Sequence, residues 1–252
     1  AARESVKRIL PFPLTGAQRR VLREIADDLR SAHPMNRLVQ GDVGSGKTMV
    51  ALLAMVIVLE NGHQAAFMAP TEILAEQHFL TLRRLLQRCA YRVELLTAAV
   101  KGKERAAALG RIASGEAQIV IGTHALIQEG VAFHRLSLAV VDEQHRFGVL
   151  QRDDLRQKGY DADVLVMTAT PIPRTLALTA YGDLDVSIVD EKPPGRTPIR
   201  TELRAASERR SVVELVRRAV GEGRQAYVVY PLVEESEKLE DVKAAAEASE
   251  EW

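Results

Sequence analysis

The segment Gly41-Asp42-Val43-Gly44-Ser45-Gly46-Lys47-Thr48 fills every fixed position of the phosphate-binding pattern G-x-x-x-x-G-K-[ST]. It follows the apolar run Leu38-Val39-Gln40 and precedes another that begins at Met49, so it lies where a strand gives way to a helix. Its glycines allow successive N–H groups to face one anion at a helix N-terminus. There Lys47 can reach the β- and γ-phosphates, and the Thr48 hydroxyl can hold Mg²⁺. The spacing predicts a site for ATP and Mg²⁺.

Two carboxylates, Asp142 and Glu143, follow the apolar pair Val140-Val141. Ligands of an open parallel sheet bind at the carboxyl ends of its strands, which is where this pair would lie. Acids are also common in the first turn of a helix, so the pair alone allows either interpretation. Its place downstream of the phosphate loop favours catalysis. We expect Asp142 to hold Mg²⁺ and Glu143 to orient the attacking water, so the predicted catalytic residues are Lys47, Asp142 and Glu143.

Threonines stand at other expected junctions between strands and helices: Thr71, Thr123, Thr168 and Thr170. Each alone is typical of a helix N-cap. Hydroxyls and helix N-termini also suit a sugar–phosphate backbone, which they position without reading its sequence. A shared place at one edge of one sheet favours the second interpretation. Thr168 and Thr170 can then couple the γ-phosphate site to movement.

Short apolar runs alternate with helical patterns along the chain and would position these residues. Strands this apolar are buried on both faces, and their alternation with helices predicts a parallel α/β sheet covered by helices. The expected strands are 38–40, 65–68, 93–96, 119–121, 138–141 and 164–167, and the expected helices are 15–29, 49–59, 71–89 and 103–112.

Residues 191–198 contain three prolines and a glycine, which predicts a linker between domains. We interpret 13–190 as a first, ATP-binding domain and 1–12 as a linker from an N-terminal region that this chain lacks. Residues 199–252 would begin a second α/β domain, since about fifty residues are too few to complete one. Its expected elements are a strand at 199–203, a helix at 207–220, a strand at 227–230 and a helix at 234–251.

Composition sets limits on function. Lys plus Arg and Asp plus Glu both total 34, so the net charge does not indicate nucleic acid, and any such site must be local. Arginines cluster within 83–92 and 204–218, which fits either a phosphate track or solvated helix faces. Cys89 is the only cysteine, which excludes a disulfide framework. No apolar run reaches the roughly 20 residues that span a bilayer. We expect a cytoplasmic protein with no membrane contact.

Four compound motifs stand in order along the chain: GDVGSGKT at 41–48, MAPTEILAEQH at 68–78, DEQHRFGV at 142–149 and TATPIPRT at 168–175. Together they resemble superfamily 2 helicases. More closely, they resemble the RecG family of ATP-dependent branched-DNA helicases. The resemblance implies RecA-like domains, ATP and Mg²⁺ as cofactors, and branched duplex DNA as partner, remodelled at stalled forks and Holliday junctions in recombination and repair. We expect a monomer.

The resemblance also assigns roles to single residues. It implies that Gln18 reads the adenine edge, which an amide can do through two hydrogen bonds, and that Phe12 packs on the base. It places Gln144, His145 and Arg174, together with the strand-end threonines, in DNA binding and in its coupling to ATP.

Other functions remain open. The translocase module of a transcription-repair coupling factor is similar at the phosphate loop and at TATPIPRT, although Ser45 and the pair Gln144-His145 favour RecG. A nucleotide-gated DNA-binding switch would share the same residues, whereas a transporter ATPase would need a signature sequence that is absent here. Family members carry a branch-splitting wedge domain before this region and the rest of the second motor domain after it. We therefore expect this chain alone to bind ATP–Mg²⁺ but hydrolyse it weakly.

Overall fold

The computed structural model describes residues 9–10, 12–127, 130–142, 161–170, 184–193 and 199–229. The chain divides into two compact units, residues 1–196 and 197–252. The boundary lies within the proline-rich segment expected to be a linker. The phosphate loop and the strands belong to the first unit.

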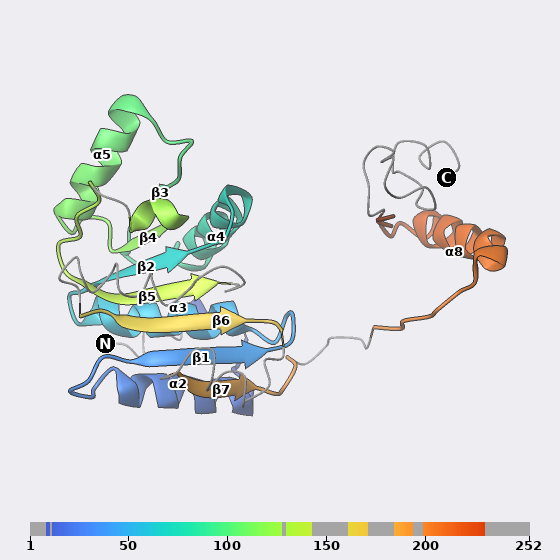
Figure 1. Cartoon of the computed structure of the whole chain (residues 1–252), viewed down its shortest axis with the longest axis horizontal. Helices are drawn as coiled ribbons and strands as arrows, with labels where there is room; N and C mark the ends of the chain where they lie inside the picture. The colour runs from blue at the N-terminus through green and yellow to red at the C-terminus, as the bar shows by residue number, and fades with distance from the viewer. Residues whose placement is uncertain are drawn as a thin grey trace, which may run out of the picture. The chain divides into compact units, whose positions relative to one another are not determined.

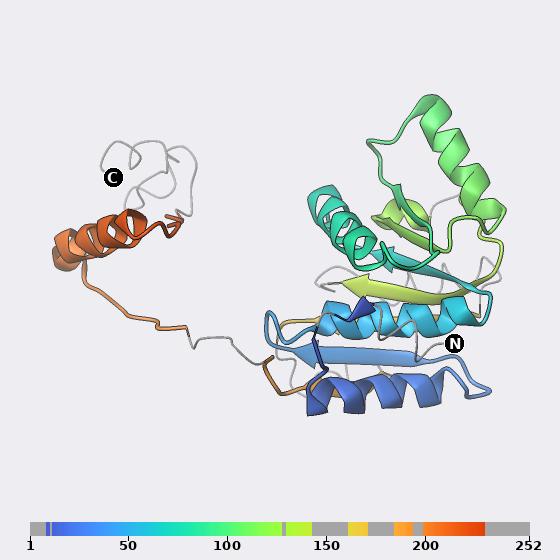
Figure 2. The ribbon, with the colours of Figure 1, turned by 180° about the vertical axis from the view of Figure 1, so that it is seen from behind.

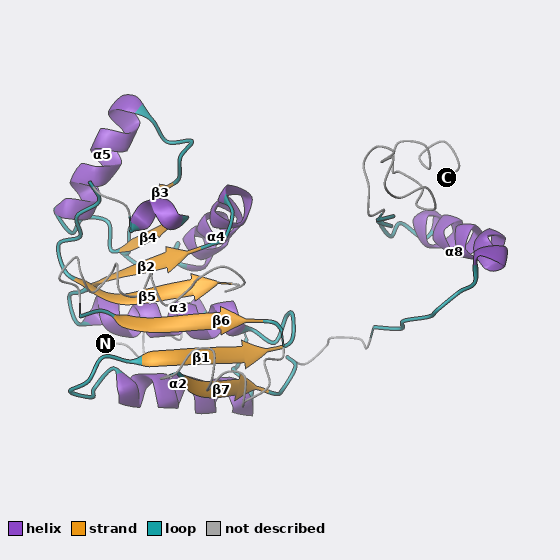
Figure 3. Ribbon diagram, viewed as in Figure 1, coloured by secondary structure: helices purple, strands orange, loops and turns teal. Residues whose placement is uncertain are grey.

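The first unit is built on a seven-stranded sheet in the order β3-β4-β2-β5-β6-β1-β7, and every pairing is parallel (Figures 1 and 3). The predicted α/β fold is confirmed. Because all strands run the same way, their carboxyl ends share one edge. The strands are β1 (Asn36–Gly41), β2 (Gln64–Met68), β3 (Val93–Leu96), β4 (Ile119–Gly122), β5 (Leu136–Asp142), β6 (Asp163–Thr168) and β7 (Asp185–Val189).

Helices cover both faces of the sheet. Buried residues of α2 (Gly16–Asp28), α3 (Lys47–Glu60) and α4 (Glu72–Leu85) pack into one core cluster with alternate strand residues. Residues of α5 (Gly102–Ala113) join the cluster on the opposite face. Figure 2 shows α3 lying along the sheet between α2 and α4. The helix α3 is apolar on all sides, which explains its burial between the sheet and its neighbours.

Strand β7 was not predicted. It pairs with β1 from Arg37 beside Asp185 to Gly41 beside Val189, at the end of the sheet order. A polar residue, Ser187, stands at a position of β7 where a buried strand usually has an apolar one. Ser187 is 2% exposed and accepts a hydrogen bond from Arg37 Nη1 at 2.9 Å. This hydrogen bond allows the serine to be buried in the sheet, so β7 lacks the apolar pattern by which a strand is recognised in a sequence. The helix α4 also ends at Leu85, earlier than the expected Cys89.

The second unit contains α8 (Arg209–Gly221), preceded by the 3₁₀ turn Ala206–Glu208. The helix expected at 207–220 is confirmed to within two residues. The strand expected at 199–203 is wrong, as is the described part of the strand expected at 227–230, where Tyr227 and Val229 are each 87% exposed. A strand needs a hydrogen-bonded neighbour, and the described part of this unit supplies none. Residues 234–251 lie outside the described ranges, and a second RecA-like domain stays a prediction.

Candidate nucleotide-binding site

The phosphate loop connects β1 directly to α3. Gly44 and Gly46 have φ angles of 76° and 91°, which side chains disfavour and glycine adopts freely. The Ser45 N–H donates to the Asp42 carbonyl at 3.0 Å and closes the turn. Lys47 is 8% exposed, and its ammonium donates to the carbonyls of Gly41 at 2.5 Å and Asp42 at 3.1 Å. A buried cation beside a helix N-terminus fits the polyphosphate of ATP.

Gly41 lies where three segments meet closely. A Cβ added there would be 2.7 Å from Ser45 Oγ and 2.9 Å from the Val189 carbonyl oxygen of β7. Only glycine therefore allows the loop to fold back over the end of β1. The Ser45 hydroxyl is buried and has no hydrogen-bond partner among the residues that the structure describes.

Strand register brings the acidic and threonine residues beside this loop. Gln40 of β1 pairs with Thr168 of β6, and Met167 of β6 pairs with Asp142 of β5. The carboxyl ends of β1, β6 and β5 are therefore immediate neighbours, at the shared sheet edge that the sequence predicted. A carboxylate and the Thr48 hydroxyl are hard oxygen donors of the kind that Mg²⁺ prefers. The residues present fit ATP and Mg²⁺.

The predicted coupling threonines bond to each other. The Oγ1 atoms of Thr168 and Thr170 are 2.9 Å apart, and the Thr170 N–H donates to Thr168 Oγ1 at 3.2 Å. Thr168 is 2% exposed. These bonds form a local turn in which the Thr168 side chain accepts a hydrogen bond from the backbone. The predicted coupling of the γ-phosphate site to movement through these two threonines stays a prediction.

Thr71 and Thr123 lie at the same edge, since Met68 at the end of β2 pairs with Gly122 at the end of β4. Thr71 Oγ1 accepts the Leu74 N–H at 3.3 Å and is the N-cap of α4. Thr123 precedes the 3₁₀ turn His124–Leu126. Neither position excludes a backbone phosphate, and DNA contact stays a prediction. The other predicted residues, Glu143, Gln144, His145 and Arg174, lie outside the described ranges.

Gln18 braces the phosphate loop. Its Oε1 accepts the Thr15 N–H at 3.0 Å and Thr15 Oγ1 accepts the Gln18 N–H at 3.2 Å, which completes a capping box at the start of α2. Gln18 Nε2 donates to the Ser45 carbonyl at 2.7 Å, and the residue is 1% exposed. Beyond these bonds, Gln18 has one lone pair of Oε1 and one N–H of Nε2 that could pair with an adenine. Adenine recognition by Gln18 stays a prediction.

Replacing Gln18 by alanine should lower the free energy of unfolding by about 1–3 kcal/mol, because it removes the acceptor of the Thr15 N–H in the capping box and leaves the buried Ser45 carbonyl without its donor. Chemical denaturation measures this loss, and titration with a fluorescent ATP analogue should show weaker binding. Arg19→Ala, at the exposed neighbouring position on α2, is the control. Equal stability of Q18A and wild type would show that the brace contributes nothing.

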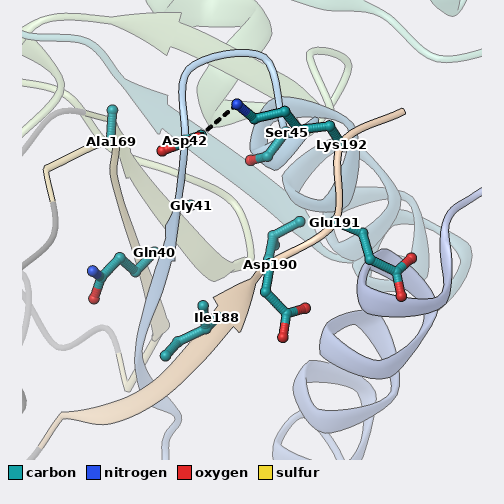
Figure 4. Close-up of a pocket in the computed structure, with 10 residues that line it drawn as sticks. Gln40, Gly41, Asp42, Ser45, Ala169, Ile188, Asp190, Glu191 and Lys192 are labelled. Atoms are coloured by element: carbon teal, nitrogen blue, oxygen red, sulfur yellow. Dashed lines mark ion pairs between the residues drawn. The ribbon is translucent and has the colours of Figure 1, made fainter. Parts of the chain in front are cut away.

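A pocket of about 240 Å³ adjoins the loop on the side of β7 (Figure 4). Its walls are the loop, Ala169 and the segment that follows β7, where Lys192 pairs with Asp42 at 2.9 Å. Arg20 of α2 pairs with Asp190 at 2.9 Å, and this hydrogen bond lowers the pKa of the Asp190 carboxyl. Ligand sites usually measure about 300–1,000 Å³, so the pocket would hold only part of a nucleotide.

The sequence did not predict the partner of Asp142. His78 Nε2 of α4 lies 2.7 Å from Asp142 Oδ2, and its ring contacts Phe67 of β2 with centroids 4.6 Å apart. One signal in the sequence could have indicated this contact. His78 lies three residues after Ala75 and four before Leu82, which are both buried, so the helical period places it on the face of α4 that packs on the sheet.

Comparisons with known proteins agree with this arrangement. The DEAD/DEAH box helicase family model matches residues 15–179. The ATP-dependent DNA helicase RecG of Synechocystis sp. is 55% identical over 244 residues, covering 97% of this chain and 29% of that protein. RecG of Bacillus subtilis is 55% identical over 231 residues, covering 92% of this chain and 34% of that protein.

A solved structure of RecG bound to a three-way DNA junction matches with a TM-score of 0.79 and 47% identity, over 92% of this chain and 31% of that chain. The parallel sheet is thus the RecA-like helicase fold. The chain spans about a third of the length of these relatives. In the described part of the chain, no helix has the length and apolar character needed to cross a membrane. The family model covers most of the sequence, so the chain belongs to the DEAD/DEAH box helicase family and, within it, is similar to RecG.

Proposed function

We propose that the chain is the ATP-binding part of a DNA helicase or translocase that remodels branched DNA, such as stalled forks and Holliday junctions. The observation that carries this proposal is the phosphate loop and Asp142 at adjacent strand ends, in a chain 55% identical to RecG over 244 residues. The relative solved on a three-way junction supports DNA as the partner.

Each predicted site residue has its own role in binding ATP, Mg²⁺ or DNA. The loop N–H groups and Lys47 bind the phosphates, and Gln18 at the start of α2 positions the base. Thr48 and Asp142 hold Mg²⁺, which when bound neutralises charge on the phosphate oxygens. Glu143 orients the water that attacks the γ-phosphate. The threonines of the same edge, with Gln144, His145 and Arg174, contact DNA and transmit the change in the ATP site.

Residues 1–252 alone should bind ATP–Mg²⁺ but hydrolyse it weakly. In phosphoryl-transfer enzymes of this kind an arginine from across the cleft contributes about 10³–10⁵ in turnover. The resemblance places that residue in the second motor domain of the longer relatives, of whose length residues 1–252 span about a third. A steady-state ATPase assay of residues 1–252, with and without branched DNA, measures the deficit. Vigorous DNA-stimulated turnover by residues 1–252 would contradict it.

The activity itself is tested on a longer protein that contains these residues. Its ATPase rate is measured with linear, forked and four-way DNA, and we expect the branched substrates to stimulate it most. Equal rates on all three would favour the translocase module of a transcription-repair coupling factor. Turnover that no DNA changes would overturn the helicase assignment. A Glu143→Gln variant that binds ATP without turnover would confirm the role of that residue.

A further inference from the structure

We propose that His78 is a positioning residue that fixes the orientation of Asp142 for Mg²⁺. The inference rests on the proposed ATP–Mg²⁺ site and adds a residue to it. The two side chains come from different elements, α4 and the end of β5, and meet at 2.7 Å between His78 Nε2 and Asp142 Oδ2. They are 14% and 13% exposed, so water competes little for this bond.

The fold holds the histidine ring in place. Ala75 and Leu82 of α4 are fully buried, and His78 lies on the same stripe, where an apolar residue would be expected. On one side its ring packs against Phe67, which is 0% exposed, with an interplanar angle of 48°. A ring restrained by packing can orient a carboxylate more closely than a mobile surface side chain can.

The chemistry of the two side chains determines which atom of the pair donates the hydrogen and which accepts it. An ionised carboxylate only accepts hydrogen bonds, so His78 Nε2 carries the hydrogen and donates it to Oδ2. That bond uses one oxygen of Asp142 and leaves Oδ1 to face the metal shell. Groups that orient metal ligands in this way typically change metal affinity or activity by about 10–100-fold when they are removed.

A purely structural role would have a different signature. If the pair only anchored α4 to the sheet, its loss would lower stability and leave the Mg²⁺ dependence of nucleotide binding unchanged. If His78 orients Asp142, its loss changes the Mg²⁺ dependence, while binding without metal stays the same. In the described structure the bonded and ring partners of His78 are Asp142 and Phe67, which lie outside the phosphate loop.

The test is binding of a fluorescent ATP analogue by residues 1–252 at increasing Mg²⁺ and in EDTA. His78→Phe keeps a ring against Phe67 and removes the donor, so we expect about 10-fold more Mg²⁺ for half-maximal enhancement of binding. His78→Gln places an amide N–H near the position of Nε2 and should restore the wild-type requirement to within about threefold. Glu76→Ala, at an exposed position of α4, is the matched control and should behave as wild type.

The outcomes separate the inference from the proposed function. Wild-type Mg²⁺ dependence in H78F, or an equal loss of binding in EDTA and in Mg²⁺, would overturn the role of His78 alone. A wild-type chain that binds no nucleotide would overturn the proposed function and the inference together. If H78F does not fold, His78→Met carries the same expectation, because it fills the stripe with a flexible apolar side chain that suits a helix.

Discussion

Replacing Lys47 by alanine is expected to weaken ATP–Mg²⁺ binding by about 100-fold or more and to remove the remaining hydrolysis. Lys47 is 8% exposed, and its ammonium is held by the Gly41 and Asp42 carbonyls. A phosphate bound there would meet a charge that is already desolvated and oriented. Truncating one partner of such a buried charge pair costs about 2–5 kcal/mol, and about 2.8 kcal/mol corresponds to 100-fold in affinity.

Lys192 provides the matched control for this prediction. It carries the same charge and lines the pocket that adjoins the loop, but its side chain is 57% exposed and pairs with Asp42. An exposed pair of this kind contributes about 0–1 kcal/mol, so Lys192→Ala should change the affinity by about fivefold at most. Calorimetric titration with ATP and Mg²⁺ measures both variants. Equal effects of K47A and K192A would mean that general positive charge, and not the buried ammonium, attracts the nucleotide.

The sheet and the phosphate loop were predictable because their signals are local in the sequence. An apolar run bounded by turn residues indicates a buried strand, and the glycine spacing of 41–48 is a backbone requirement. Edge strand β7 was missed because the burial of Ser187 depends on Arg37, a residue 150 positions away. The strand expected at 199–203 and the described part of the one expected at 227–230 are wrong for a related reason: a strand forms only where a neighbouring segment pairs with it.

The contacts around the candidate site were less predictable than its residues. The position of Asp142 at the sheet edge was predictable because it follows an apolar run, but its bond to His78 joins residues 64 positions apart through the packing of α4. The brace from Gln18 to Ser45 spans 27 positions and depends on how α2 meets the loop. Such contacts follow from the three-dimensional packing of helices on the sheet, and sequence spacing does not encode them directly.

Replacing Gly122 by alanine is expected to have the largest effect on stability. Gly122 ends β4 beside Leu96 of β3, and an added Cβ would lie 2.1 Å from the Leu96 carbonyl oxygen and 3.0 Å from the Leu126 side chain. A backbone oxygen cannot rotate away as a side chain can, so β3 must shift along the sheet. Overpacking of this kind costs about 1–3 kcal/mol, and we expect a loss near 3 kcal/mol in the free energy of unfolding.

At Gly110 the same substitution, glycine to alanine, is expected to increase stability. Gly110 lies inside α5, and an added Cβ would meet no atom within 4 Å. Gly110→Ala should therefore raise the free energy of unfolding by about 0.5–1 kcal/mol, because alanine loses less conformational freedom in a helix. Urea denaturation of both variants measures the difference. If G122A were as stable as wild type, the close approach of β3 and β4 would be wrong, and with it the position of Thr123 at the edge where DNA is proposed to bind.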